Sequence, residues 1–197
     1  MASDVTICNM ALSHIGESTQ VAMIDPPDNS VYAGLCATFY GVARAELIER
    51  GNWSFTLKRT TIAAVANPST AWTFAYALPS DCLKVVRVLE TGGTDDAEGA
   101  AFTIEGGVLF TDQENAEVVY CRDVTDANAF SPTFIVSLSY LLASYLAGPI
   151  VKGAEGTKVA DAMRQRSGVL GSASAAISAN AQTDDADYTS SSVVARS

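Results

Sequence analysis

Apolar residues recur every three or four positions in two segments near the start of the chain. Residues 3–15 carry such a stripe, Ser3 or Asp4 can cap its beginning, and Gly16 can end it. Residues 30–50 carry a second stripe after a loop that contains two prolines. Both segments are therefore predicted to be helices.

The predicted helix at 30–50 has two unlike sides. A broad apolar face is expected to be core, and it consists of Val31, Tyr32, Leu35, Phe39, Val42, Ala43 and Leu47. The other side, which we call the small-residue strip, consists of Ala33, Gly34, Ala37, Gly41 and Ala45. Each glycine costs roughly 1 kcal/mol of helix stability relative to alanine, so the strip indicates close approach of another backbone. A second helix of this chain and a neighbouring subunit fit the strip equally well.

The stretch from residue 51 to 88 holds both tryptophans and changes to a period of two. The aromatic residues that alternate with other positions are Trp53, Phe55, Trp72, Phe74 and Tyr76. Such alternation is typical of strands or extended chain, here as a hairpin or strand pair held against helices. Pro79 interrupts the run, and a β-branched strand is expected at 83–88.

Short strands are also expected at 102–104, 108–110 and 118–120, with a hairpin turn at Gly106-Gly107. Together they predict a small antiparallel sheet from about residue 74 to 123. Another glycine pair, Gly92-Gly93, is likewise expected to form a turn.

A third helix is predicted at about 132–146, with Pro132 in its first turn. It lies in an uncharged stretch, 127–151, that is long enough to suggest a membrane span. Several serines and a break at Gly148-Pro149 favour a buried core helix instead. A fourth helix, rich in alanine and serine, is expected from Gly156 or Thr157 towards Ala181.

These elements predict an α+β fold: a helical bundle of about four helices, an inserted small antiparallel β-sheet and an extended C-terminal arm. Residues 1–73 and 127–183 are assigned to the bundle, and residues 74–126 to an acidic β insertion. Residues 184–197 are polar and are expected to be a flexible arm, disordered when alone.

The negative charge of the chain is concentrated in one segment. The net charge is −10, and residues 90–126 hold ten acidic residues against a single base, Arg122. Such a surface repels phosphate backbones, which argues against a conventional DNA-binding module. A well-solvated β-rich region is the simpler interpretation.

Several motifs, taken in order, make the chain resemble the head-to-tail adaptor proteins of tailed phages, especially the tubular tail protein A type of short-tailed phages. The matching residues are Ile15, Gly16 and Glu17; Trp53, Phe55 and Arg59; Tyr76, Leu78, Pro79, Asp81, Cys82, Leu83, Lys84 and Val85; and Val118 to Phe134. The resemblance spans roughly residues 5 to 180 and depends on the order and spacing of packing and turn residues.

The resemblance implies a virion structural protein of the tail neck, assembled in the host cytoplasm. It implies a ring of twelve identical subunits, fixed beneath the portal and continuing the DNA channel towards the tail nozzle. The small-residue strip would contact a subunit or partner, together with Asp184, Asp185, Asp187 and Tyr188 of the arm. The motif residues expected to be structural core are Trp53, Phe55, Arg59, Tyr76, Pro79 and Asp81. The acidic segment would face a basic tail partner or the lumen.

Residues that could carry chemistry are few. His14 is the only histidine and is expected to be a partly buried structural residue. The cysteines are expected to be free thiols rather than disulfides or zinc ligands, and they are Cys8, Cys36, Cys82 and Cys121. No cofactor or metal is predicted, because the sequence has no P-loop, no dinucleotide-binding fingerprint and no zinc-protease motif.

The alternative function is that of a tail-associated, cell-wall-degrading glycoside hydrolase. Such an enzyme needs two carboxyl groups at a set separation. Glu17 with Asp25, or Glu46 with Glu49, could supply them. The second pair has ordinary helix-surface spacing, so a structural role is favoured for both pairs.

Overall fold

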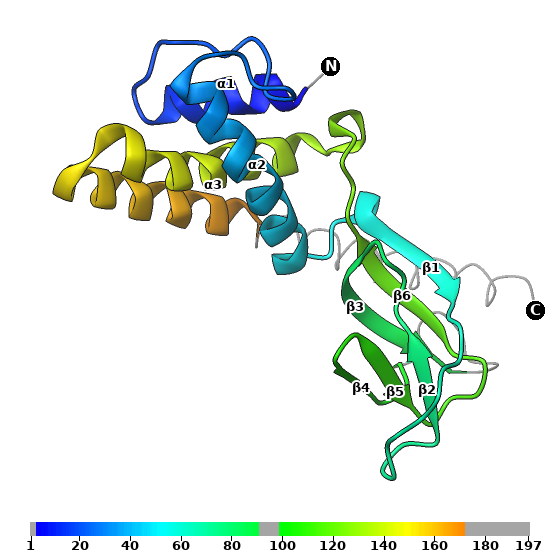
Figure 1. The fold of residues 1–197 in the computed structure, drawn as a ribbon. Coiled ribbons are helices and arrows are strands. Elements are labelled where there is room, and N and C mark those ends of the chain that lie inside the picture. Colours follow the sequence, from blue (N-terminus) through cyan, green and yellow to red (C-terminus); the bar gives the residue numbers. More distant parts are fainter. Residues whose placement is uncertain (1–2, 91–98, 172–197) are drawn as a thin grey trace, which may run out of the picture. The chain divides into compact units, whose positions relative to one another are not determined.

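The computed structural model describes residues 3–90 and 99–171, and it confirms the α+β class. The chain divides into two compact units. The first, the helical unit, comprises residues 1–55 and 124–197, and the second, the β unit, comprises residues 56–123. Figure 1 shows helices in one and strands in the other.

The helical unit contains four helices within the described residues. They are α1 (Asp4–His14), α2 (Val31–Arg50), α3 (Pro132–Val151) and a last helix that occupies residues 153–171. Two short 3-10 turns, η1 (Ser54–Thr56) and η2 (Ala127–Ala129), lie close to the two places where the chain passes between the units. The end of the fourth predicted helix lies outside the described residues.

The three named helices begin where the sequence predicted, because each has a serine cap. The hydroxyl oxygens of Ser3, Ser30 and Ser131 each accept a hydrogen bond from a backbone N–H three residues later. Gly16 follows α1 with a φ of +86°, a conformation that glycine adopts without strain. The predicted start of each of these helices is confirmed.

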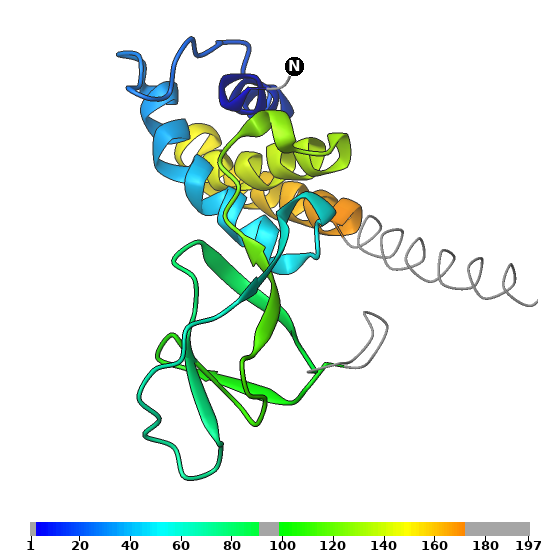
Figure 2. The ribbon, with the colours of Figure 1, turned by 90° about the vertical axis from the view of Figure 1, so that its right-hand side faces the viewer.

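Helix α3 is the centre of the helical unit, and both α1 and α2 pack against it (Figure 2). It ends five residues later than predicted, and the expected break at Gly148-Pro149 is wrong. Pro149 lies in the last turn of the helix, so the one backbone hydrogen bond that it removes is near the helix end and α3 still continues to Val151. The chain turns instead at Lys152 and Gly153, which both have a φ of +62°.

Helix α3 is also the one described helix that is long and apolar enough to cross a membrane. More than half of its apolar stretch is buried by the rest of the protein, as in the core helix of a globular domain.

The predicted core face of α2 is wrong in part. Val31 and Val42 are 77% and 55% exposed, whereas Leu47 is buried as predicted. The face turned to the core consists of Ala33, Cys36, Tyr40, Ala43 and Leu47. Its spacing alternates between three and four residues, and three of its side chains, Ala33, Cys36 and Ala43, are small enough to let α2 approach its neighbours closely. Side-chain bulk therefore indicated the core face of this helix only in part.

The β unit has more strands than predicted, arranged in two antiparallel sheets of three. One sheet has the order β1 (Leu57–Thr61), β6 (Glu117–Arg122), β3 (Cys82–Leu89). The other has the order β2 (Phe74–Ala77), β5 (Val108–Thr111), β4 (Phe102–Glu105). Single bridges, Val88 with Ala100 and Ala64 with Tyr76, join the two sheets at both sides. The strands thus close into a small barrel, which shields its sheet edges.

Apolar side chains from both sheets fill this barrel. They are Ile62, Tyr76, Val85, Val88, Leu109, Ala116, Val118 and Tyr120. Strands β4 and β5 form a hairpin through Gly106 and Gly107, with φ values of +57° and +81°. Positive φ at both positions suits the right-handed twist of a hairpin and confirms that predicted turn. Gly92-Gly93 lies outside the described residues.

The border between the units differs from the one expected from sequence. The β unit begins at Thr56 rather than at residue 74, and it ends at Asp123 rather than at residue 126. The difference at its beginning is due to β1, which pairs along its length with β6. The polar sequence of β1, LKRTT, gave no strand signal.

Candidate interaction sites

One side of α2 is uncharged, and its residues are exposed or half-buried within the described structure. We call Val31, Gly34, Thr38, Gly41, Val42 and Ala45 the α2 outer face; they follow one another at helical spacing. A Cβ atom added to Gly34 or Gly41 would meet nothing within 4 Å. No charged residue occurs from Val31 to Ala43. A solvated helix face normally carries charged side chains, so this face is suited to another protein surface.

The small-residue strip is divided by this geometry. Ala33 is fully buried in the helical unit, so it packs within this chain. Gly34, Gly41 and Ala45 are half-buried and Ala37 is exposed. Among the described residues, no second helix covers the two glycines closely. That a neighbouring subunit does so remains a prediction.

Four aromatic side chains join the end of α2 to the start of α3. Phe134 is fully buried and packs edge-on against Trp53, Phe55 and Phe130, with ring-centroid distances of 4.9, 5.0 and 4.8 Å. The indole Nε1–H of Trp53 donates a hydrogen bond of 2.9 Å to the carbonyl oxygen of Leu47. Trp53 and Phe55 thus belong to the packing of the helical unit.

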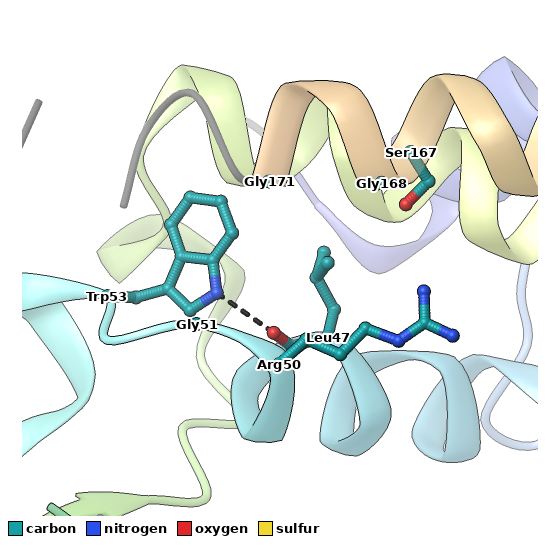
Figure 3. Close-up of a pocket in the computed structure, with 7 residues that line it drawn as sticks. All are labelled: Leu47, Arg50, Gly51, Trp53, Ser167, Gly168 and Gly171. Carbon is teal, nitrogen blue, oxygen red and sulfur yellow. Dashed lines mark hydrogen bonds between the residues drawn. The ribbon is translucent and has the colours of Figure 1, made fainter. Parts of the chain in front are cut away.

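A cavity of about 120 Å³ opens beside Trp53 (Figure 3). The last turn of α2 and the helix at 153–171 supply its walls. The lining residues are Leu47, Arg50, Gly51, Trp53, Ser167, Gly168 and Gly171. The hydroxyl of Ser167 donates a hydrogen bond to the carbonyl oxygen of Ser137, 2.8 Å away. The remaining walls are mainly indole, leucine and glycine backbone, so the cavity suits an apolar or aromatic group.

Next to this cavity, one carboxylate holds two arginines. Glu46 pairs with Arg50 on its own helix and with Arg164 at 2.6 Å. It also accepts a hydrogen bond from the hydroxyl of Tyr145, and this bond raises the pKa of the phenol. These three partners hold the Glu46 side chain in place. Glu49, its partner in the hydrolase alternative, is exposed.

His14 lies where α1 meets α3. Its imidazole stacks on Tyr140 with ring centroids 4.0 Å apart, and its Nε2 lies 3.0 Å from the hydroxyl of Ser139. Because that hydroxyl donates to the carbonyl oxygen of Val136, it accepts from His14 Nε2–H. Burial, and then the positive charge of Arg166, lower the pKa of the imidazole. His14 is partly buried, and its contacts are those of a packing residue.

The motif residues in the β unit are divided between core and surface. Tyr76 is buried, and its hydroxyl donates to the carbonyl oxygen of Gln113 at 2.8 Å. Asp81 accepts a hydrogen bond from Tyr120, and Pro79 lines a shallow groove beside Lys58 and Tyr120. Arg59, in contrast, is exposed on β1 and is not part of the core. The predicted Trp53–Phe55–Arg59 element therefore spans both units.

Most acidic side chains of the acidic segment are exposed where the structure describes them. Glu90, Glu105, Asp112, Glu114 and Asp126 are exposed. Glu117 and Asp123 are half-buried. Asp112 accepts hydrogen bonds from the backbone and the hydroxyl of Thr73, and these lower the pKa of its carboxyl. The other acidic residues of the segment, Asp95, Asp96 and Glu98, lie outside the described residues. Whether the segment faces a basic tail partner or the lumen therefore remains a prediction.

All four cysteines are free thiols in the structure, and Cys8, Cys36 and Cys121 are buried. A hydrogen bond with Cys36 and then burial hold the pKa of the Cys8 thiol well above its usual range. Burial raises the pKa of Cys82 to about 11. Within residues 3–90 and 99–171, no group of three or more His, Cys, Asp or Glu side chains is placed to hold a metal ion.

Sequence reasoning missed the cavity and its neighbouring ion cluster. Gly168 and Gly171 offered a signal, because two glycines one turn apart weaken a helix and need a packing reason. The pairing of Glu46 with Arg164 offered none, since it joins positions 118 residues apart. Four predicted contact residues, Asp184, Asp185, Asp187 and Tyr188, lie outside the described residues. No model of a protein family matches the chain, and no curated protein matches it.

Proposed function

We propose that this chain is a structural adaptor of the head-to-tail junction of a short-tailed phage. Identical copies form a ring that joins the portal to the tail nozzle and continues the channel through which DNA passes. The chain contributes shape and contact surfaces to this assembly and breaks no bond.

The observation that carries the proposal is the α2 outer face. A lone globular protein rarely leaves a helix side of this length accessible to solvent and without charge. Val31 and Val42 expose most of their side chains there, and the glycines between them admit a close neighbour. Closed rings bury one such surface per subunit against a different surface of the next subunit. The motifs occur in the same order as in phage adaptor proteins, and this resemblance is the reason for placing the ring at the head-to-tail junction.

The test is a measurement of the mass of the purified chain, first alone and then mixed with the portal protein of the same phage. We expect a ring of defined copy number on the portal, and electron microscopy of that complex should show it as a continuation of the portal channel. A chain that stays monomeric with the portal, or that hydrolyses cell-wall glycan as a monomer, would contradict the proposal.

A further inference from the structure

The cavity beside Trp53 has the size of one side chain. Its volume of about 120 Å³ is slightly below that of an engineered protein cavity, roughly 150 Å³, that binds benzene. A Cβ atom at Gly168 would meet nothing within 4 Å, and one at Gly171 would only touch Leu47 and Trp53 at about 4 Å. Gly168 is exposed and Gly171 is half-buried, and neither glycine places a side chain in the space beside Trp53.

Positive charge lies at the mouth of this cavity. Arg50 lines it, and Arg50 and Arg164 share the single carboxylate of Glu46. The three charges sum to +1, and the side chains of Arg50 and Arg164 are 37% and 47% exposed. An occupant with an aromatic ring and nearby carboxylates would satisfy both features.

The chain itself contains such a segment beyond the described residues. Residues 184–188 read DDADY, with three acidic side chains just before Tyr188. No basic residue follows Arg166 until Arg196. The phenol ring of Tyr188 thus matches the cavity in size, and the aspartates before it match the two arginines in charge.

We propose that the cavity beside Trp53 binds the Tyr188 side chain of a neighbouring copy, while the aspartates before it pair with Arg50 and Arg164. The inference rests on the proposed ring and names a segment that links its subunits. A neighbouring copy is the better source because the sequence predicts that the helix lining the cavity continues towards Ala181. The same copy's Tyr188 would then have to reverse direction within seven residues.

The test places a photocrosslinker in the full chain through Tyr188→p-benzoylphenylalanine, which keeps an aromatic ring at this position. Equal amounts of isotopically heavy and light chains are assembled with the portal and irradiated. We expect crosslinks from position 188 to peptides that contain residues 47–53 or 167–171, half of them joining a heavy chain to a light one. Crosslinks within one copy, or to other surfaces, would overturn the inference.

Two variants test the cavity and the charges separately. Gly168→Leu adds a bulky side chain to the helix turn that lines the cavity, and it should lower the crosslink yield about tenfold, which equals about 1.4 kcal/mol of binding. Gly148→Leu is its matched control, because Gly148 is an exposed helical glycine with nothing within 4 Å of its added Cβ. Replacing Asp184, Asp185 and Asp187 by asparagine should also lower the yield and remove its salt dependence.

The outcomes separate this inference from the proposed function. If rings form on the portal but position 188 does not crosslink to the cavity, this inference is wrong and the proposed function stands. Failure of the unaltered chain to form rings would end both. Equal yields in Gly168→Leu and Gly148→Leu would show that Tyr188 does not enter the cavity.

Discussion

The phenolic hydroxyl of Tyr120 donates a hydrogen bond of 2.8 Å to Oδ1 of Asp81, and Lys58 lies 3.4 Å from Oδ2 of the same carboxylate. Tyr120 is fully buried on β6, Lys58 belongs to β1, and Asp81 immediately precedes β3. The Asp81 side chain thus joins β1, β6 and β3 at one end of the barrel. The hydrogen bond from Tyr120, followed by the charge of Lys58, lowers the pKa of Asp81.

Tyr120→Phe should therefore weaken the β unit and change its response to acid. Loss of the hydrogen bond should cost about 0.5–1.5 kcal/mol of unfolding free energy, because Asp81 stays partly hydrated. Since its folded pKa is depressed, Asp81 stabilises the fold above its ordinary pKa of 3.8 and loses this effect as pH falls further. Urea unfolding and NMR titration of the Asp81 carboxyl should show a smaller acid dependence and a higher pKa in the variant.

Tyr76→Phe is the control for that change. It removes a hydrogen bond of the same length, from the hydroxyl to the carbonyl oxygen of Gln113, at another place in the same barrel. It should cost a similar free energy without altering the titration of Asp81. An unchanged Asp81 pKa in Tyr120→Phe would mean that Lys58 and not Tyr120 governs this carboxyl.

The fold class and most helix and strand positions could be predicted because their signals are local. Ser30 caps α2, Pro132 opens α3, and Gly106-Gly107 makes a hairpin turn, each through chemistry within a few residues. Strand β1 could not be found this way, since its sequence is polar and it is held by pairing with β6, about sixty residues later. Closure of the barrel depends on two single bridges that no periodicity reveals.

Gly51→Ala should destabilise the helical unit. An added Cβ would lie 2.8 Å from Nε1 of Trp53 and 3.2 Å from its Cε2, so the indole must move. That movement disturbs the hydrogen bond to Leu47 and the contact with Phe134. Overpacking of this kind costs about 1–3 kcal/mol, which thermal or urea unfolding followed by tryptophan fluorescence can measure.

Gly171→Ala is the matched control, because its Cβ would make only ordinary contacts with Leu47 and Trp53. It should be neutral or slightly stabilising, since alanine is favoured over glycine in a helix by up to about 1 kcal/mol. Equal stability of the two alanine variants would show that the indole has room beside Gly51.

His14 should make the stability of the helical unit fall in mild acid. Burial and Arg166 lower its folded pKa, so the fold favours the neutral imidazole. Its contribution is complete above the ordinary pKa of 6.5 and decreases as pH falls below that value. Because the chain has a single histidine, NMR titration assigns this pKa without ambiguity. His14→Gln should remove this part of the pH dependence of the melting temperature.

Arg166→Gln tests the smaller of the two causes. It should raise the pKa of His14 only partly towards 6.5, because burial remains. Arg166 lies 5.8 Å from the centre of the Tyr140 ring on which His14 stacks, so a small loss of stability at neutral pH is also expected. A His14 pKa at or above 6.5 in the unaltered chain would contradict the effect of burial.

The candidate sites were less predictable than the fold because they depend on which side of a helix is already occupied. In α2, large residues such as Val31 and Val42 indicated a core face, but Ala33 and Cys36 turn inward. Small side chains serve two purposes on this helix: some permit packing on α3 and others leave an outer face smooth. Composition cannot distinguish these purposes, because both require only the absence of bulk.

Gly41→Glu should separate folding from assembly. An added side chain at Gly41 meets nothing within 4 Å, and glutamate is a better helix former than glycine, so the unfolding free energy should stay the same or rise by up to about 1 kcal/mol. In the ring, the same carboxylate would be buried in an uncharged interface without a partner, which is strongly unfavourable. Ring formation on the portal, followed by mass measurement, should therefore be lost while the melting temperature is kept. Gly148→Glu, on an exposed turn of α3, should leave ring formation and the melting temperature unchanged. A Gly41→Glu chain that loses its fold would show that the small-residue strip packs within one molecule.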